Sequence, residues 1–326
     1  TAPSTDYIGA ARPQPAGTSP DMGAIENSLG VASAKTITVC HSPGTPHCYG
    51  NDLIEYGEYS NIQTAISAAN DGDTVLVYPG TYIENINFNG KNIVVQGIDR
   101  ETTIIDGSFN APTVTFTEQG LTNPQLLGFT IRNGIPGIQC NDQSDNTNPT
   151  IQNCIITENG DQGVISDGGN MKLIDCIISN NIGSGCRLLR GYKEISGCII
   201  RNNSSHGLDL YEESASVINC LIINNGNDGI YLRYNYPLNL INSTIANNGA
   251  DGLSINEGGR PFIRNTIIYG HNDRQIHFED SGVMEVDIDF SMIELGESGG
   301  VYFENTLMGS LLWGENNISD DPLFVD

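Results

Sequence analysis

Apolar and polar positions along this chain repeat every 22 residues. Four cysteines, each followed by two aliphatic residues, open the repeat at identical intervals: Cys154, Cys176, Cys198 and Cys220. The same three-residue phrase, with a hydroxyl residue in place of cysteine, recurs at 243–245 and 266–268. An asparagine follows five residues after the start of most phrases, and a glycine then precedes two aliphatic residues separated by one other residue. Short strands and turn residues at a fixed period of about 22 predict the coils of a parallel β-solenoid.

Segments outside the cysteine-marked region follow the same pattern. We expect strands at 36–40, 74–77, 92–96, 103–106, 113–116 and 126–131, and looser coils from 284–293 to 311–313. Residues 61–70 instead carry apolar residues on one helical face behind Asn61, a candidate N-cap. Such a helix covers the first coil, whose open strand edges would otherwise recruit other chains. The sequence therefore predicts an all-β solenoid of about ten coils with a short N-terminal capping helix.

Two rows of identical residues are expected to run along the solenoid. Cys154, Cys176, Cys198 and Cys220 share one apolar repeat position, so we expect one inward thiol per coil, with Cys140 and Cys186 inward on the neighbouring strand. Coils lie about 4.8 Å apart, but parallel side-chain directions suit neither disulfides nor a tetrahedral zinc site. The asparagines of the repeat are expected to hydrogen-bond from coil to coil: Asn159, Asn181, Asn203, Asn225 and Asn248.

Cys40 and Cys48 bracket a loop that contains Pro and Gly, unlike the repeat cysteines. Two interpretations stay open: a disulfide that closes this loop, which depends on an extracellular location, or two free thiols. The acidic loops 71–73 and 142–145 lack the spacing of an EF-hand. No cofactor is predicted, and bound Ca²⁺ stays an open expectation.

The chain carries a formal charge of −25, with 39 acidic and 14 basic residues. Such a field repels nucleic acid and anionic membranes, so neither is an expected partner, and it disfavours polyanionic glycans unless a local basic patch overrides it. No stretch approaches the roughly 20 apolar residues of a membrane helix, so no membrane insertion is expected. The start at Thr1 is typical of a processed or excised end, which is compatible with a lost leader.

Several segments resemble a known superfamily. Residues 62–66, 72–77, 79–82 and 84–86 resemble the N-terminal cap of pectin-lyase-like right-handed parallel β-helices, and the Asn-Cys-Ile-Ile, Asn-Asn-Gly and Gly-Ile phrases resemble their repeats. The resemblance covers roughly residues 36–313 and implies a right-handed parallel β-helix. It indicates little about activity, because the superfamily hosts lyases, hydrolases, epimerases, adhesins and phage spikes.

The two ends resemble a second family in reversed order. Residues 6–9, 12–13 and 21–26 resemble the closing segment of bacterial choice-of-anchor surface β-helix proteins, and 318–326 resembles the stretch that normally precedes it. We therefore expect an N-terminal extension, 1–34, and a β-helix domain, 35–326. Either the chain was cut from a longer array of modules, or the extension docks on the last coil of a neighbouring copy. The residues expected to take part in assembly are Asp6, Arg12, Asp21, Glu26, Pro322 and Phe324.

Candidate chemistry lies at outward positions of equivalent strands, because the chain contains no local catalytic motif. Two residues after the repeat glycine stand Ile165, Arg187, Asp209, Tyr231 and Ser254, and two further on stand Asp167, Leu189, Tyr211, Arg233 and Asn256. Strand alternation turns these columns to one outer face, and Lys193 and His206 are close to it in sequence. The carbohydrate-binding candidates are Arg187, Arg190, Asp209, Tyr211, Tyr231 and Arg233.

Two interpretations of this face compete. Tyrosine rings stack on sugars and arginines neutralise carboxylates, so the face is typical of a sugar-binding groove. In a lyase or hydrolase, Asp209, Glu212, Arg187 and Arg233 would be the candidate catalytic residues. The simpler interpretation is a solvated sheet face with ion pairs between coils, such as Arg187–Asp209 and Arg190–Glu212. No catalytic residue is assigned, and the metal ligands, if any, are unknown.

The end segments and the missing catalytic signature favour a non-enzymatic module at the cell surface or outside the cell. Such a module would self-associate head to tail into a filament, or adjoin other modules of a longer chain. The alternative is a polysaccharide lyase or glycoside hydrolase, or a carbohydrate-binding module, that uses the face around Asp209, Tyr211 and Arg233.

Overall fold

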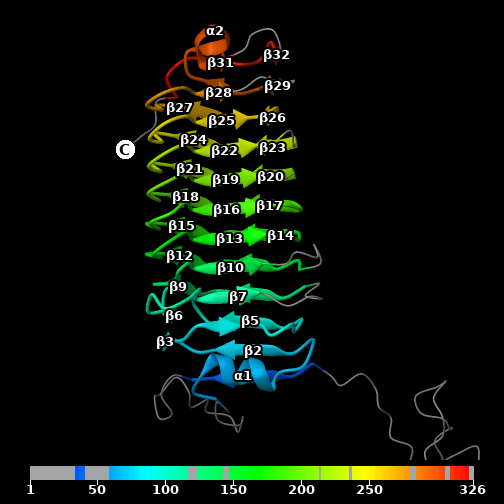
Figure 1. The fold of residues 1–326 in the computed structure, drawn as a ribbon, viewed down its shortest axis with the longest axis vertical. Coiled ribbons are helices and arrows are strands. Elements are labelled where there is room, and N and C mark those ends of the chain that lie inside the picture. The colour runs from blue at the N-terminus through cyan, green and yellow to red at the C-terminus, as the bar shows by residue number, and fades with distance from the viewer. Residues whose placement is uncertain are drawn as a thin grey trace, which may run out of the picture. The chain divides into compact units, whose positions relative to one another are not determined.

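The computed structural model describes residues 34–40, 59–116, 123–141, 147–212, 214–234, 237–279, 284–304 and 309–322. The chain divides after Lys35 into two units, and the second, Thr36–Asp326, contains all the described strands. Its strands pair in parallel with the equivalent strands of the preceding and following coils. The coils of this unit stack along one axis (Figure 1). The parallel β-solenoid predicted from the 22-residue repeat is therefore confirmed.

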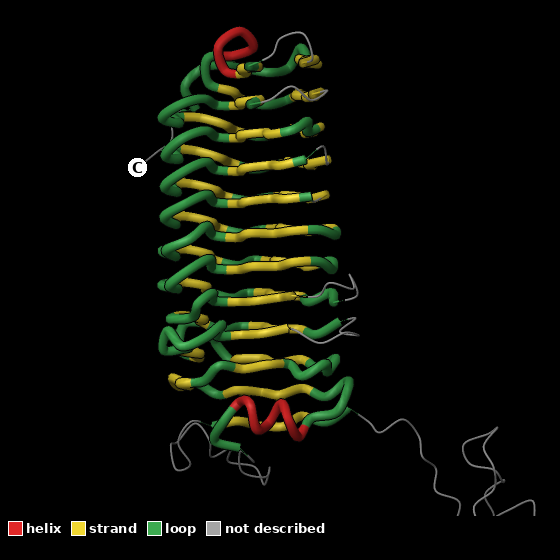
Figure 2. Tube along the Cα trace, viewed as in Figure 1, coloured by secondary structure: helices red, strands yellow, loops and turns green. Residues whose placement is uncertain are grey.

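The described strands of this unit form three sheets, and the tube in Figure 2 shows them as stacked rungs joined by turns. The first sheet holds twelve strands, in the order β1 (Thr36–Val39), β2 (Thr74–Val77), β5 (Val94–Gly97), β8 (Gln125–Leu127), β11 (Thr150–Gln152), β14 (Met171–Ile174), β17 (Tyr192–Ser196), β20 (Ser214–Ile218), β23 (Pro237–Ile241), β26 (Arg260–Arg264), β29 (Met284–Asp289) and β32 (Gly309–Trp313). The second sheet holds ten, β4 (Ile86–Asn87), β7 (Val114–Phe116), β10 (Ile138–Asn141), β13 (Val164–Asp167), β16 (Cys186–Leu189), β19 (Leu208–Tyr211), β22 (Ile230–Arg233), β25 (Leu253–Asn256), β28 (Ile276–Phe278) and β31 (Val301–Phe303). The third sheet also holds ten, β3 (Gly80–Ile83), β6 (Thr103–Asp106), β9 (Thr130–Arg132), β12 (Ile155–Thr157), β15 (Ile177–Ser179), β18 (Ile199–Arg201), β21 (Leu221–Ile223), β24 (Thr244–Ala246), β27 (Ile267–Tyr269) and β30 (Met292–Ile293).

Strand alternation decides which residues enter the core. In the third sheet the second isoleucine of each Cys-Ile-Ile phrase is fully buried, as at Ile156, Ile178 and Ile200. The first aliphatic residue of the phrase is half-buried and faces outward. The parallel register places each residue over its counterpart in the next coil, so like residues form rows along the axis.

In the five coils from β11 to β24, one residue in the left-handed conformation joins the first sheet to the third. These residues are Asn153, Asp175, Gly197, Asn219 and Asn242, with φ between 52° and 64°. Glycine adopts this conformation freely, and Asn and Asp tolerate it better than other residues. Their recurrence explains the abundance of these residues in the repeat.

A short helix covers the first coil, as the sequence predicted. Helix α1 (Ile62–Ala68) buries Ile62, Ala65 and Ile66 completely, and Asn61 Oδ1 accepts a hydrogen bond from Thr64 N at 2.9 Å. Glu84 accepts the first free N–H groups of the helix, and Lys91 Nζ donates to its last carbonyls. Both charges have the sign that the helix dipole favours at that end. The second helix, α2 (Gly296–Gly300), lies near the other end of the unit (Figure 1).

The thiol row lies in the core. Cys154, Cys176, Cys198 and Cys220 are at most 3% exposed, and the backbone N–H that follows each of the last three donates to the carbonyl of the cysteine in the preceding coil. Cys140 and Cys186 are also buried. Three hydroxyls continue the row where the sulfur stops: Ser243, Thr266 and Ser291, linked by hydrogen bonds of 3.1 to 3.5 Å.

The asparagine row forms a continuous chain of buried hydrogen bonds. Each side-chain Nδ2 from Asn159 to Asn225 donates to Oδ1 of the next asparagine at 2.9 to 3.0 Å. The row ends at His271, whose Nδ1 accepts from Asn248 N at 3.2 Å. Burial lowers the pKa of His271 to about 4, so the ring is neutral and keeps this acceptor.

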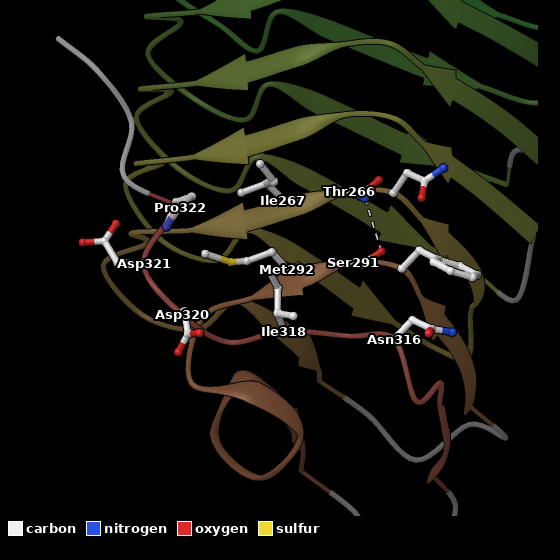
Figure 3. Close-up of a pocket in the computed structure, with 11 residues that line it drawn as sticks. Thr266, Ile267, Ser291, Met292, Asn316, Ile318, Asp320, Asp321 and Pro322 are labelled. Carbon is white, nitrogen blue, oxygen red and sulfur yellow. Dashed lines mark hydrogen bonds between the residues drawn. The ribbon is translucent and has the colours of Figure 1, made fainter.

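Some expectations fall partly outside the described residues. Cys40 is disulfide-bonded, while Cys48 lies outside the described residues. So do Asp6, Arg12, Asp21, Glu26 and Phe324 of the expected assembly segments and the acidic loop 142–145. Pro322 is described and lies near β27 of its own chain, as Figure 3 shows.

Candidate functional site

The outer face of the second sheet carries the two columns aligned from the sequence. Arg187 pairs in register with Asp209, Asp209 with Tyr231, and Tyr231 with Ser254. The adjoining column places Tyr211 beside Arg233 and Arg233 beside Asn256. The sequence-based alignment of these positions therefore has the register of the structure.

Asp209 lies at the centre of this face and is only 6% exposed. Its two carboxylate oxygens are each 3.7 Å from an arginine Nε, one of Arg187 and one of Arg233. At that distance neither contact is a hydrogen bond, and Asp209 Oδ1 and both Nε atoms are buried without a hydrogen-bond partner. The expected Arg187–Asp209 pair is thus present as a loose contact.

Two side chains that were expected on or near this face, Arg190 and Lys193, make other contacts. Arg190 pairs with Asp167 of the preceding coil at 2.6 Å, a partner that the sequence alignment did not propose, and the expected pair with Glu212 stays a prediction. Lys193, expected near the outer patch, is fully buried, because strand alternation places it in the inward row of Met171 and Ala215. Its ammonium donates to backbone carbonyls at the corner of the coil, including Gly169 O at 2.7 Å.

Tyr211 and Tyr231 on this face both contact other protein side chains. The His206 ring stacks on Tyr231 with 4.9 Å between ring centres, and Arg233 Cζ lies 4.4 Å from the Tyr231 ring centre. Tyr211 and Tyr234 meet edge to face, with a 3.4 Å hydrogen bond between their hydroxyls. The ring of Tyr231 therefore lies against protein side chains, and the stacking on sugar expected from the sequence stays a prediction.

A hollow of about 350 Å³ opens beside Tyr231, and we call it the β22–β28 hollow. Its lining combines histidines, carboxylates, one arginine and one tyrosine from successive coils: His206, Asn227, Asp228, Tyr231, Ala250, Asp251, Asp273, Arg274, His277 and Glu279. Four carboxylates thus face one guanidinium, which gives the hollow a negative potential where the histidines are neutral.

Hydrogen bonds fix the acidic side of this hollow. Asp228 Oδ1 accepts from Asp251 N at 2.9 Å, and Asp251 Oδ1 accepts from Arg274 N at 2.8 Å, so each carboxylate holds the backbone of the next coil. The other Asp251 oxygen is 2.7 Å from His277 Nδ1. Glu279 accepts hydrogen bonds from Ser254 Oγ at 2.6 Å and from Asn256 Nδ2 at 3.0 Å.

The charge state of His277 follows from these contacts. Burial disfavours the charged imidazolium, but the hydrogen bond to Asp251 and the charge of that carboxylate outweigh it, so the pKa of His277 is raised. Burial, with the nearby Glu279 carboxylate, also raises the pKa of Tyr231, so this phenol is neutral at ordinary pH. The hollow therefore offers hydrogen-bond donors beside carboxylate acceptors.

A second hollow of about 230 Å³ opens farther along the same sheet, and we call it the β10–β16 hollow. It is lined by Gln139, Cys140, Asn141, Ile165, Asp167, Arg187 and Leu189. Arg187 borders this hollow and Tyr231 borders the other, and Asp209 lies between these two residues in the same column. The seven strands from β10 to β28 thus present polar groups over a length on the order of 30 Å, at about 4.8 Å per coil.

A third hollow, of about 420 Å³, lies on the third sheet. Figure 3 shows Ile267, Met292 and Ile318 along its apolar floor, with Asn316 and Asp320 toward its edges. Ile318 pairs with Met292 as an isolated bridge. The side chains that line this hollow hold no cluster of ionisable groups other than two adjacent aspartates, so it suits chemistry less well than the second sheet.

Sequence reasoning missed the residues around His277. The coils lengthen from 22 to 23 residues after Cys220, and Gln275 stands where the repeat glycine was expected, so residues 276–278 were not aligned. The residues that precede each repeat glycine could have indicated this hollow from the sequence. That column reads His206, Asp228, Asp251 and, before Gln275, Arg274, and all four line the β22–β28 hollow.

Comparison with known proteins identifies the class of fold. The model of the right-handed β-helix region family matches residues 47–235 and 163–310. The chain therefore belongs to this family, and the expected pectin-lyase-like right-handed parallel β-helix is confirmed. None of the curated proteins matches the chain by sequence at a significant level.

Several solved structures are similar to the chain. The Geobacillus virus E2 ORF18 protein has a TM-score of 0.62 at 15% identity over 86% of this chain, and the chain spans 60% of that protein. An alginate lyase from Paenibacillus sp. str. FPU-7 has a TM-score of 0.53 at 13% identity over 87% of this chain and 99% of its own. Pectate lyase Pel9A has a TM-score of 0.50 at 14% identity, with 91% and 84% covered. These likenesses show a shared fold.

No described helix has the length and apolar character that a membrane crossing requires.

Proposed function

We propose that the protein binds polysaccharide along the outer face of its second sheet, outside the cytoplasm. The observation that carries this proposal is the pair of open hollows on one sheet, lined by convergent hydrogen-bonding groups and bridged by Arg187, Asp209 and Tyr231. Sugar hydroxyls both donate and accept hydrogen bonds, and this face offers carboxylates, guanidinium groups, amides and a phenol in rows. An extended polymer engages several such subsites at once.

The charge of the face bears on which glycan it takes. Carboxylates and basic groups alternate along it, so it offers no purely basic track for a polyanion. The formal charge of −25 adds repulsion for polyuronates at low salt. We therefore infer that neutral polysaccharides bind more tightly than polyuronates.

The test is binding to a panel of neutral polysaccharides and polyuronates by affinity electrophoresis and isothermal titration calorimetry. Arg187→Ala and Tyr231→Phe should each weaken binding about tenfold, which corresponds to about 1.4 kcal/mol. Matched controls change the same residue types elsewhere: Arg201→Ala on the third sheet and Tyr192→Phe on the first. Absence of binding across the panel, or equal losses in the controls, would overturn the proposal.

The same panel separates binding from catalysis. An enzyme releases reducing ends or unsaturated products, and Asp209→Ala or Arg233→Ala should abolish their release. Binding without product defines a carbohydrate-binding module.

End-to-end assembly is a second candidate function, favoured by the difference between the two ends of the solenoid. Helix α1 covers the first coil, whereas Phe303, Leu311 and Trp313 of the last coil are only partly buried in the part of the chain that the structure describes. Exposed apolar residues and a terminal strand edge favour association with another chain. We infer that residues 1–34 of a second copy bind there.

Light scattering and negative-stain microscopy of the full chain test this candidate. Concentration-dependent polymers should disappear when residues 1–34 are deleted and when Trp313 is changed to Glu. A monodisperse monomer at high concentration would exclude the assembly.

A further inference from the structure

Three ligand-type side chains in the β22–β28 hollow converge on one point. Asp251, His277 and Glu279 each offer one ligand atom, and these atoms lie within 4.8 Å of one another. Asp251 precedes β25, His277 lies in the middle of β28, and Glu279 directly follows β28. The parallel register of β25 with β28 therefore brings the three together.

The surroundings of this set are those of a built site rather than a solvated acidic surface. Asp251 is 5% exposed and His277 is 6% exposed. Asp251 is fixed by the Arg274 N–H, and Glu279 by Ser254 and Asn256. Metal ligands are characteristically held by such outer hydrogen bonds, which set their orientation before the ion arrives.

An independent observation is the space beside the three groups. The hollow of about 350 Å³ is open to solvent, so it offers an entry path and room for water ligands. Asp228 and Asp273 also line it and add negative charge near the ligand atoms. Arg274 opposes a cation, since its guanidinium lies 3.3 Å from the His277 ring, but it is also held over Tyr302 at 4.1 Å.

We propose that Asp251, His277 and Glu279 form a binding site for a divalent transition-metal ion such as Zn²⁺, Mn²⁺ or Co²⁺. One imidazole nitrogen with two carboxylates is a donor set that these ions accept, whereas Ca²⁺ prefers oxygen ligands alone. With metal–ligand bonds of about 2.0 to 2.2 Å, the Asp251 oxygen and His277 Nδ1, now 2.7 Å apart, must separate by a few tenths of an ångström to hold the ion between them. The ion takes the place of the hydrogen bond between His277 Nδ1 and Asp251.

The proposal is independent of glycan binding, because the metal is titrated into the full chain without sugar. Calorimetry on chelator-treated protein should show one equivalent of Zn²⁺ or Co²⁺ bound at this site, and bound Co²⁺ should give visible absorption bands. Glu279→Gln, which keeps the side-chain shape, and His277→Gln should each weaken binding at least tenfold. Ca²⁺ and Mg²⁺ should compete poorly.

The matched control is Glu194→Gln on β17 of the first sheet, which makes the same change as Glu279→Gln at a carboxylate outside the hollow. It should bind the metal as the unchanged protein does. Circular dichroism checks that each variant is folded, and Glu279→Gln keeps the test informative if His277→Gln unfolds. Unaltered binding in both ligand variants, equal loss in the control, or no binding of transition metals at micromolar concentration would overturn the proposal.

Discussion

A single buried histidine, His271, makes the stability of this fold depend on pH. His271 ends the asparagine row in a neutral form, with Nδ1 accepting from Asn248 N and Nε2 3.2 Å from Ile245 O. A proton on Nδ1 removes that acceptor. Because the pKa of His271 is lowered to about 4, the unfolded chain takes up this proton at a higher pH than the folded chain does.

The sign of the effect follows from that difference. The contribution of neutral His271 to the free energy of unfolding is fully present above the ordinary histidine pKa of about 6.5. It is lost as the pH falls from there toward 4, by about 3 kcal/mol at most. We predict that His271→Asn, which continues the asparagine row, removes this dependence.

Thermal melts of both proteins between pH 7.5 and 4 check this prediction. The unchanged protein should lose stability relative to His271→Asn as the pH falls. Parallel curves would show that His271 does not titrate in this way.

At the scale of an element, the asparagine row joins neighbouring coils through buried amides. Asn203 Oδ1 accepts hydrogen bonds from both the backbone N and the side-chain Nδ2 of Asn181, at 3.2 and 2.9 Å. Asn203→Ala leaves these donors buried without a partner, at about 1–3 kcal/mol each. The melting temperature should therefore fall by several degrees.

The control for this prediction is Asn239→Ala on an exposed position of β23. That change should leave the melting temperature within about a degree, because exposed surface substitutions usually cost less than about 0.5 kcal/mol. Equal effects of the two changes would contradict a structural role for the row.

The thiol row makes a separate prediction about reactivity. Burial and the neighbouring cysteines raise the pKa of Cys186, and all six free cysteines of the described residues are buried. Thiolate is the reactive species and needs access to reagent. These six thiols should resist a thiol reagent in the native protein and react after guanidinium unfolding, which a colorimetric thiol assay measures. Rapid labelling of the native protein would contradict the inward placement.

At the scale of the whole molecule, helix α1 covers the first coil and thereby prevents its association with other chains. Ile66 of α1 is fully buried against the first coil, while Ser67 beside it is exposed. Ile66→Asp should displace the cap and expose a strand edge and core side chains, so light scattering should detect self-association. Ser67→Asp should remain unassociated, and similar behaviour of the two variants would contradict a capping role.

Much of the architecture is readable from the sequence because equivalent residues stack in register. The intervals of Cys154 to Cys220 predicted the coils, and Asn61 with its apolar face predicted the helix. The same alignment placed Arg187, Asp209 and Tyr231 in one column, since strand alternation and coil stacking together decide which outward residues meet.

The rest depends on details that no repeat expresses. The pairing of Arg190 with Asp167 was not predicted, because Arg190 lies at a left-handed corner with a φ of 51°. Strand alternation does not set the direction of a side chain at such a corner. Lys193 lies inside because it occupies the inward row of Met171, a position where a charged residue is unexpected. His277 was not predicted as a site residue, because the later coils are one residue longer and Gln275 replaces the repeat glycine.

A crystal structure of the protein soaked with oligosaccharides of the tightest-binding polysaccharide would locate the sugar-binding face directly. We predict sugar density along the outer face of the second sheet, in contact with Arg187 and Tyr231 and running from the β10–β16 hollow toward the β22–β28 hollow. Sugar bound only to another sheet, or a face free of sugar at saturating concentration, would contradict it.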